Sequence, residues 1–373
     1  MVLSGKTGVL ILAFVALTTG LLGCGQRETG VIGVVEPSSL TTEVAEYKSH
    51  RLFVATTRAK DDDPSVLFSG QRSENLNLAR VTVTVPARHV AGQIETSKSW
   101  PPNPSDGFTI ADPDVFGSDG DFARSLEAEL NRRRPEDRTL MYFVHGYNTT
   151  LSEAILRMGQ FIHDSGYKGV PVLFSWASGG DPLSYVYDLN SVLEARDDLL
   201  HAIYLSVPTN ARALDVVSHS MGNLLVVEAM RQAKLEGRFN RTGRLRYVIL
   251  ASPDIDVDLF KRQLDVFPPS ERRFYVLVSK DDRTLSFSRW LARGVPRVGS
   301  EDAEQLSKLG VTVFDLSEIE VDGSNHTKFA NSPEIVRLIG NRLNADPPLP
   351  TSRIVGSLGR TLQGATIQIF GPR

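Results

Sequence analysis

The stretch ALDVVSHSMG, residues 213–222, joins an apolar run to a sharp polar turn. Its first five residues have the length and composition of a buried β-strand. Ser218-His219-Ser220-Met221-Gly222 then places small residues two positions either side of a serine, as a tight strand-to-helix turn requires. Serine rather than glycine at position 218 is a mild departure from that pattern. Apolar residues 224–227 begin a helix-like segment, so the stretch predicts a strand–turn–helix unit that presents Ser220 as a nucleophile.

A candidate general base can be found by elimination. A serine hydroxyl attacks at neutral pH only with a base, usually a histidine that a carboxylate orients. When a serine is presented on such a turn, the acid and then the histidine follow it in the chain. Of the seven histidines, only His326 lies beyond Ser220, in a loop after the apolar run 311–314. We therefore predict that His326 is the base rather than a solvated loop residue.

The acid should follow a strand between the serine and the histidine. Two strand-like runs, 247–250 and 274–278, occupy that interval. Asp254 follows the first run, and the Asp281-Asp282 pair follows the second. The later strand is the usual position, which favours Asp282, and Asp254 remains the alternative. Asp254 also fits the N-cap of a helix over 255–264.

An oxyanion hole is indicated earlier in the chain. The apolar run 140–144 predicts a strand, and it leads directly into His145-Gly146-Tyr147. A backbone N–H from such a turn and one from the residue after the nucleophile commonly bind the oxyanion. We therefore expect the N–H groups of Tyr147, or Gly146, and of Met221 to do so. Glycine at 146 would let the backbone approach the substrate closely.

Strand and helix patterns alternate from residue 122 onward, which predicts an α/β fold with a mostly parallel central sheet and helices on both faces. We expect one domain over 47–346, with opening strands and a loop in 47–136 and a catalytic core in 137–346. Residues 347–373 form a predicted C-terminal tail with one short strand within 366–370. After the expected strand 170–175, Trp176, Tyr185 and Tyr187 either line a substrate pocket or pack a helix onto the sheet.

Several segments together resemble a known family. FVHGYNT (143–149), FSWAS (174–178), YD (187–188) and SHSMGN (218–223) resemble bacterial α/β-hydrolases that are catalogued mainly as a domain of unknown function, with esterase- and lipase-like assignments. SPDID (252–256) and DRTL (282–285) are similar to later motifs of that family, and the resemblance covers about residues 48–345. It implies an α/β-hydrolase fold with Ser220, Asp282 and His326 at the triad positions, and it implies no particular substrate.

The N-terminus reads as an export signal. Lys6 is followed by an uncharged, mostly apolar run over 8–23, shorter than the roughly 20 residues of a spanning helix. LLGC (21–24) resembles a bacterial lipobox, and Cys24 is the only cysteine of the chain. We predict a signal peptide over 1–23, a lipidated Cys24 and a flexible tether over 24–46, with an uncleaved membrane anchor as the alternative. Gly25, instead of the aspartate typical of inner-membrane retention, favours anchoring to the outer membrane of the cell envelope.

Composition and motifs limit the possible partners. The net charge is −3 and no basic stripe is present, which argues against nucleic acid. No metal- or nucleotide-binding motif follows a strand, so we expect no cofactor and no metal. The expected function is hydrolysis of a small-molecule or lipid-like ester at a membrane. A serine peptidase and a non-catalytic binding module on the same fold are the alternatives. The sequence does not indicate an oligomeric state.

Overall fold

The computed structural model describes residues 47–99, 101–321, 324–345, 361–362 and 365–372. The predicted signal peptide, Cys24 and the tether lie outside these residues. Among the helices that are described, none is both long and apolar enough to cross a membrane.

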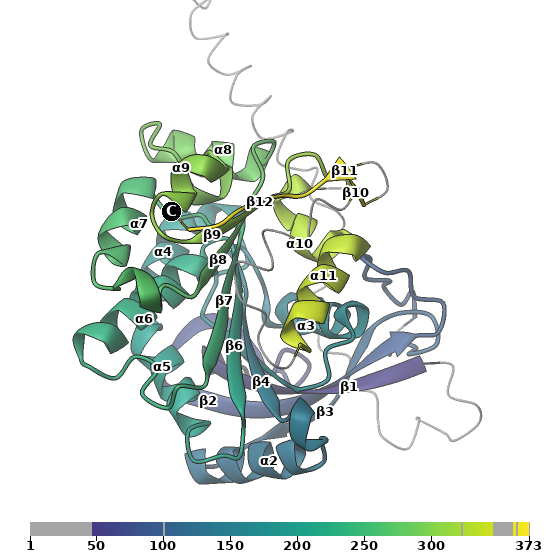
Figure 1. Cartoon of the computed structure of the whole chain (residues 1–373). Helices are drawn as coiled ribbons and strands as arrows, with labels where there is room; N and C mark the ends of the chain where they lie inside the picture. Colours follow the sequence, from purple (N-terminus) through teal and green to yellow (C-terminus); the bar gives the residue numbers. More distant parts are fainter. Residues whose placement is uncertain (1–46, 100, 322–323, 346–360, 363–364, 373) are drawn as a thin grey trace, which may run out of the picture.

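A ten-stranded sheet runs through the centre of the molecule (Figure 1). Its strand order is β12-β9-β8-β7-β6-β4-β5-β1-β2-β3. Neighbours from β1 to β9 pair in parallel, whereas β2 and β3 at one edge and β12 at the other are antiparallel. The strands are β1 (Tyr47–Lys60), β2 (Phe68–Pro86), β3 (Thr109–Val115), β4 (Thr139–Val144), β5 (Val170–Ser175), β6 (Ala213–His219), β7 (Leu245–Ala251), β8 (Phe274–Val278), β9 (Thr312–Asp315) and β12 (Gln368–Phe370). The short strands β10 (Thr361–Leu362) and β11 (Ala365–Thr366) pair with each other.

Helices cover both faces of the sheet, which confirms the predicted fold class (Figure 1). Residues 185–205 form two consecutive helices that meet at Ala195. The helices are α2 (Asp119–Asn131), α3 (Leu151–Ser165), α4 (Tyr185–Glu194), α5 (Arg196–Leu205), α6 (Gly222–Leu235), α7 (Val257–Leu264), α8 (Arg283–Leu291), α9 (Ala303–Ser307), α10 (Lys328–Asn331) and α11 (Pro333–Leu343). Single 3-10 turns are η3 (Pro135–Asp137), η4 (Pro182–Ser184), η5 (Pro269–Glu271), η6 (Val298–Ser300) and η7 (Asn325–Thr327).

The core lies in two layers, one on each side of the sheet. Because side chains alternate along a strand, the fully buried β4 supplies both layers. Tyr142 and Val144 pack with residues of α4, α5 and α6, whereas Met141 and Phe143 pack with residues of α3, α10 and α11. Burial on both faces explains why this strand is apolar throughout rather than alternating.

The connections place the candidate site at one edge of the sheet. Parallel strands have their carboxyl ends at the same edge, and ligands of such sheets bind there. The segments after β4, β6, β8 and β9 carry Gly146, Ser220, Asp282 and His326, respectively. Residues far apart in the chain are thereby brought to one edge.

The end of the chain belongs to the sheet. The strand expected within 366–370 is β12, and it pairs antiparallel with β9. Ile367, just before it, is buried in the layer that contains α3 and α11. This part of the predicted tail therefore packs on the domain.

Candidate active site

Ser220 occupies the turn between β6 and α6, as the sequence predicts. Its φ is 53°, in the left-handed region that non-glycine residues seldom adopt. The Ser220 N–H donates to the carbonyl of Ala251 at 3.0 Å, and the Ser220 carbonyl accepts the N–H of Asp254 at 3.2 Å. The strained residue is thus held on both sides, by the end of β7 and by the connection that follows it, at the carboxyl edge of the sheet.

Ser218 and Asn223 hold the turn from inside. The Ser218 hydroxyl donates to Asn223 Oδ1 at 2.5 Å, and Asn223 Nδ2 donates to the carbonyls of Ser220 and Ala251, each at 2.9 Å. All three hydrogen bonds are buried. Serine in place of glycine at 218 therefore supplies a hydrogen bond that glycine could not make.

Two glycines let the neighbouring backbone approach the turn. A β-carbon at position 146 would lie 2.8 Å from Cβ of Ser220 and 2.9 Å from Nδ1 of His219. A β-carbon at position 222 would lie 2.2 Å from the carbonyl oxygen of His145. Gly146 therefore lies directly against Ser220. Met221, the residue after the candidate nucleophile, is buried at the N-terminus of α6.

The structure brings His326 and Asp282 together. The distance from His326 Nδ1 to Asp282 Oδ2 is 2.7 Å, and both side chains are buried. The other carboxylate oxygen of Asp282 accepts the N–H groups of Thr284 and Leu285, at 3.0 and 3.1 Å. Asp282 is thus the N-cap of α8, and its orientation is fixed from both sides.

Asp281, next in the chain to Asp282, holds the segment that carries the histidine. Lys328 Nζ lies 2.9 and 3.0 Å from the two oxygens of Asp281, and Asn325 Nδ2 donates to Oδ2 at 2.8 Å. Lys328 is almost completely buried, and its ammonium group also donates to the carbonyl of Leu316 at 3.1 Å. Asn325 and Lys328 lie on either side of His326 in the chain. Their contacts with Asp281 therefore fix the backbone that carries the imidazole.

His219 is a second neighbour of His326 that the sequence did not reveal. Its Nε2 donates to the backbone carbonyl of His326 at 3.0 Å, and the two ring centroids are 4.6 Å apart. Burial, helped by the adjacent His326, lowers the pKa of His219 well below its usual value. A neutral His219 therefore ties Ser220, its neighbour in the chain, to the loop of His326.

The turn after β4 is supported by Arg58, which is fully buried. Arg58 donates to the Ser175 hydroxyl at 2.8 Å and to the carbonyls of Ser178 and Thr149 at 3.0 and 2.6 Å. Burial lowers the pKa of Arg58 to about 10, so the guanidinium stays charged at neutral pH. The chain at Thr149, just beyond the expected oxyanion turn, is thereby fixed to the end of β5.

Asp188 of α4 holds the same turn through Asn148. Its Oδ2 accepts the Asn148 N–H at 3.1 Å and the Ser178 hydroxyl at 2.6 Å, and its Oδ1 accepts the Gly179 N–H at 2.8 Å. Asn148 has a positive φ of 54°. The buried carboxylate thus stabilises a left-handed residue two positions after Gly146.

His145 is a structural residue of the turn after β4. Its Nδ1 donates to the Gly146 carbonyl at 2.8 Å, and its Nε2 lies 3.1 Å from the Ser175 hydroxyl. Burial and the nearby Arg58 lower its pKa to about 3, so it remains neutral. Trp176 is fully buried, stacks on the His145 ring at 4.9 Å and donates to the His145 carbonyl. These contacts favour the packing interpretation of Trp176 over the pocket interpretation.

Three remaining candidate residues, Asp254, Tyr185 and Tyr147, contact one another or Arg297. Asp254 pairs with Arg297 at 3.2 Å, and Tyr185 donates to its Oδ2 at 3.4 Å. The helix cap for which Asp254 was considered is Asp256, whose carboxylate accepts the first N–H groups of α7. Tyr147 packs edge-on against Tyr185, with ring centroids 5.3 Å apart.

Tyr187, the other pocket candidate, is half-buried and faces the antiparallel strands. Its hydroxyl donates to the Gly70 carbonyl at 3.0 Å, and the guanidinium of Arg72 lies 4.6 Å above its ring. These contacts fix α4 to β2. The adjacent residues Tyr187 and Asp188 thus have different structural roles. Tyr187 contacts β2, whereas Asp188 binds the turn after β4.

A separate apolar cavity of about 510 Å³ lies near the amino ends of β4, β6 and β7. Leu140, Leu214 and Leu245, at the starts of these strands, are among its lining residues. It contains none of the candidate catalytic residues. Because the strands separate it from Ser220, we do not assign the substrate to it.

Comparison with known proteins places the chain in a family. A family described as an alpha/beta hydrolase of unknown function (DUF900) matches residues 122–342, which is more than half of the chain. The chain belongs to this family. That match confirms the resemblance inferred from the HGYNT and SHSMGN segments. None of the proteins with curated descriptions matches this chain.

Among solved structures, several esterases are similar to this chain at a distance. An esterase from Pyrobaculum calidifontis is 12% identical, with a TM-score of 0.36, over 73% of this chain and 83% of that chain. A Pseudomonas putida esterase is 13% identical, with a TM-score of 0.34, over 83% of this chain and 85% of that chain. Likenesses this distant carry no argument about the substrate of this family member.

The close contact at Gly222 leads to a stability test. Alanine is normally the better helix former by about 1 kcal/mol. At position 222 we expect alanine instead to lower the free energy of unfolding by about 1–3 kcal/mol, because its methyl group would overlap the His145 carbonyl. Denaturant unfolding of Gly222→Ala measures this loss. Gly117→Ala is the matched control, since its β-carbon would meet no atom within 4 Å. A Gly222→Ala variant as stable as the control would contradict the described packing.

Proposed function

We propose that the protein is a serine hydrolase that cleaves carboxylic esters through an acyl-enzyme. In this proposal Ser220 is the nucleophile, His326 the general base and Asp282 the acid that orients the base. The observation that carries it is the 2.7 Å contact between His326 Nδ1 and Asp282 Oδ2, at the sheet edge where Ser220 adopts its left-handed turn. The His219 side chain links the two halves of this arrangement.

The tautomer of His326 follows from its partner. A carboxylate oxygen can only accept, so Nδ1 of His326 donates the proton in the contact with Asp282. The Nε2 atom of the neutral ring then keeps its lone pair and is the nitrogen that takes the proton of the serine. Burial of the Asp282 carboxylate strengthens its interaction with the imidazolium that forms.

The reaction would proceed in two halves. In the first, Ser220 Oγ bonds to the ester carbonyl carbon as His326 accepts the hydroxyl proton. The carbon–oxygen bond to the alcohol then breaks, and His326 returns that proton to the departing alkoxide. In the second half His326 takes a proton from water, the hydroxide attacks the acyl-enzyme, and the proton goes back to Ser220 Oγ. The net change is one ester and one water to one acid and one alcohol.

Backbone N–H groups would stabilise the oxyanion. The Met221 N–H lies at the positive end of α6, and the Gly146–Tyr147 turn approaches Ser220 closely. Arg58 and Asp188 fix that turn before any substrate arrives. Preorganisation of this kind avoids reorganisation in the transition state, which is where its catalytic benefit arises.

Exposed apolar side chains support an ester with an apolar acyl part. Leu183 and Val186 lie in η4 and at the start of α4, on the segment that follows β5, and they are 94% and 68% exposed. Trp290 and Leu291 at the end of α8, on the segment that follows β8, are also exposed. Both segments leave the same edge of the sheet as Ser220. Exposed apolar groups around a site are suited to apolar ligands.

The proposal includes attachment to a membrane through Cys24. The support for it is the sequence: an apolar segment without charges ends in LLGC, and this cysteine is the only one of the chain. A lipid-anchored hydrolase would meet lipid-like esters at the membrane surface. This part is independent of the catalytic proposal and is tested separately below.

The nucleophile can be tested by labelling. We expect a fluorophosphonate probe to label the wild-type protein at Ser220, and Ser220→Ala to abolish both labelling and hydrolysis of p-nitrophenyl esters. The residual rate should be lower by several orders of magnitude. Ser105→Ala is the control, because it removes a serine hydroxyl from the loop before β3, away from the turn, and it should label and hydrolyse esters like wild type. Folded wild-type protein that takes no label would favour a non-catalytic binding module. Faster cleavage of aminoacyl anilides than of esters would favour a peptidase.

The acid can be tested with two matched substitutions. Asp282→Asn should lower kcat on the order of 10⁴-fold, because the amide favours the wrong tautomer of His326. Asparagine can still cap α8, so the fold should remain intact. Asp254→Asn should leave kcat within about tenfold of wild type, since Arg297 and not His326 faces that carboxylate. Ester hydrolysis and a thermal melt of each variant measure this, and a larger loss in the Asp254 variant would reassign the acid.

The anchor can be tested by fractionation. When residues 1–373 are produced in a Gram-negative host, the wild-type protein should sediment with membranes and carry a lipid on Cys24, and Cys24→Ser should carry none. The mass of the purified wild type should correspond to a chain that begins at a lipid-modified Cys24. A wild-type protein without lipid that keeps residues 1–23 would instead identify an uncleaved anchor.

A further inference from the structure

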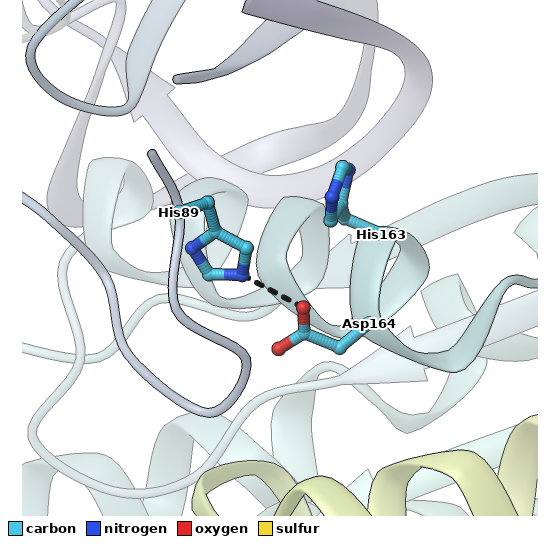
Figure 2. A group of neighbouring side chains, drawn as sticks. All are labelled: His89, His163 and Asp164. Carbon is cyan, nitrogen blue, oxygen red and sulfur yellow. Dashed lines mark hydrogen bonds and ion pairs between the residues drawn. The ribbon is translucent and has the colours of Figure 1, made fainter. Parts of the chain in front are cut away.

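A second group of ligand-type side chains lies away from Ser220. It consists of His89, in the segment that follows β2, and of His163 and Asp164 in the last turn of α3 (Figure 2). The first turn of α3 follows the HGYNT segment, and the helix is 15 residues long. Its last turn therefore lies at the opposite end of the helix from that segment. The proposed ester hydrolysis uses none of these side chains.

The geometry of this group suits a small cation. One ligand atom from each of His89, His163 and Asp164 lies within 4.8 Å of the other two. His89 Nε2 and Asp164 Oδ1 are already 2.7 Å apart, the contact drawn as a dashed line in Figure 2. The side chains of these two residues are only 5% and 2% exposed. Small shifts would bring all three atoms to the distances of about 2.0–2.2 Å that a zinc ion requires.

Each of the three side chains also makes a hydrogen bond to a residue outside the group. His89 Nδ1 lies 2.8 Å from Glu95 Oε2, and His50 Nε2 lies 3.0 Å from His163 Nδ1. The second oxygen of Asp164 accepts the Gly92 N–H at 2.8 Å and an amide N–H of Gln160 at 2.5 Å. A histidine with a carboxylate behind it, and a carboxylate held by hydrogen bonds, are the usual surroundings of metal ligands.

The charges of the neighbouring side chains would favour a bound cation. Asp164 and Glu95 are acidic, and they raise the pKa of His89 against the opposing effect of burial. Burial and the neighbouring His89 lower the pKa of His163, and burial with His163 lowers that of His50 to about 4. The Glu95 and Asp164 carboxylates lie on opposite nitrogens of the His89 ring and supply negative charge that would balance a bound cation.

We propose that His89, His163 and Asp164 bind one zinc ion that cross-links the segment after β2 to the end of α3. Binding would replace the proton between His89 Nε2 and Asp164 Oδ1, so one proton would be released for each ion bound. Two imidazoles and one carboxylate suit zinc, whereas calcium and magnesium prefer sets of oxygen ligands. A water molecule or His50 would complete the tetrahedral set.

The ion would also stabilise the segment after His326. Gly92, whose N–H binds Asp164, packs so closely on α10 that a β-carbon there would lie 2.2 Å from the Asn331 carbonyl. Gln160, the other partner of Asp164, donates to the Ala330 carbonyl at 2.9 Å. Helix α10 begins two residues after His326. We therefore expect the ion to raise thermal stability without taking part in the chemistry at Ser220.

The experiment uses the untagged mature chain after treatment with a chelator. Co²⁺ is added first, because its visible absorption reports nitrogen and oxygen ligands directly, and Zn²⁺ is then added in competition. We expect one ion per chain, displacement of Co²⁺ by Zn²⁺, and a higher Tm with Zn²⁺. Asp164→Asn and His163→Ala should each weaken binding by at least about 100-fold, and Glu95→Gln by about 10- to 100-fold.

Two controls separate this site from general effects. His201→Ala removes another histidine paired with an aspartate, the exposed contact to Asp119 at 2.8 Å, and it should bind like wild type. Ser220→Ala should also bind like wild type, so failure of the catalytic proposal would not affect the result. If the folded wild-type chain takes up neither ion, or if Asp164→Asn and His163→Ala both bind as wild type does, the proposal is overturned. The titration of the wild-type chain with Co²⁺ and Zn²⁺ tests the proposal even if a variant does not fold.

Discussion

The left-handed backbone of Ser220 is the constraint on which the carboxyl edge of the sheet depends. A non-glycine residue in this region costs on the order of 1–3 kcal/mol and persists only where its surroundings enforce it. Here the enforcing groups come from three directions: the Ala251 carbonyl, the Ser218–Asn223 pair, and the close backbone at Gly146. A shift in any of them would be transmitted to the others, because the closely packed atoms around this turn leave little free volume to absorb it.

Two consecutive aspartates show how surroundings separate the roles of identical side chains. Asp282 is buried, caps α8 and faces the ring of His326. Asp281 faces the other way and binds Lys328, whose ammonium group is buried beneath the same loop. Asp281 therefore fixes the backbone around His326, and Asp282 contacts the imidazole itself. A buried ammonium group paired in this way is fixed strongly, since leaving its charge without a partner would cost a large free energy, whereas the Asp281 carboxylate is partly exposed.

Local patterns were enough to predict much of the fold and part of the site. The apolar run of β6 and the small residues after it identified the turn at Ser220, and chain order alone selected His326. The helix boundary at Ala195 and the cap at Asp256 were missed, because both depend on packing and hydrogen bonds that the sequence does not specify. Arg58 and its partner Ser175 are 117 residues apart, and His89 lies 74 residues before His163. Such pairings arise only when the sheet brings distant segments together, so no motif of fixed spacing reveals them.

The strand β12 has a consequence for how the molecule behaves at high protein concentration. Without it, β9 would be the last strand of the sheet, and its free N–H and carbonyl groups would invite the strands of other molecules to add to the row. The final residues of the polypeptide occupy that position and pair with 313–315. β12 is then the outermost strand, and because it has only three residues it offers few unpaired groups to another molecule, so extending this segment with further strand-forming residues would lengthen the exposed edge.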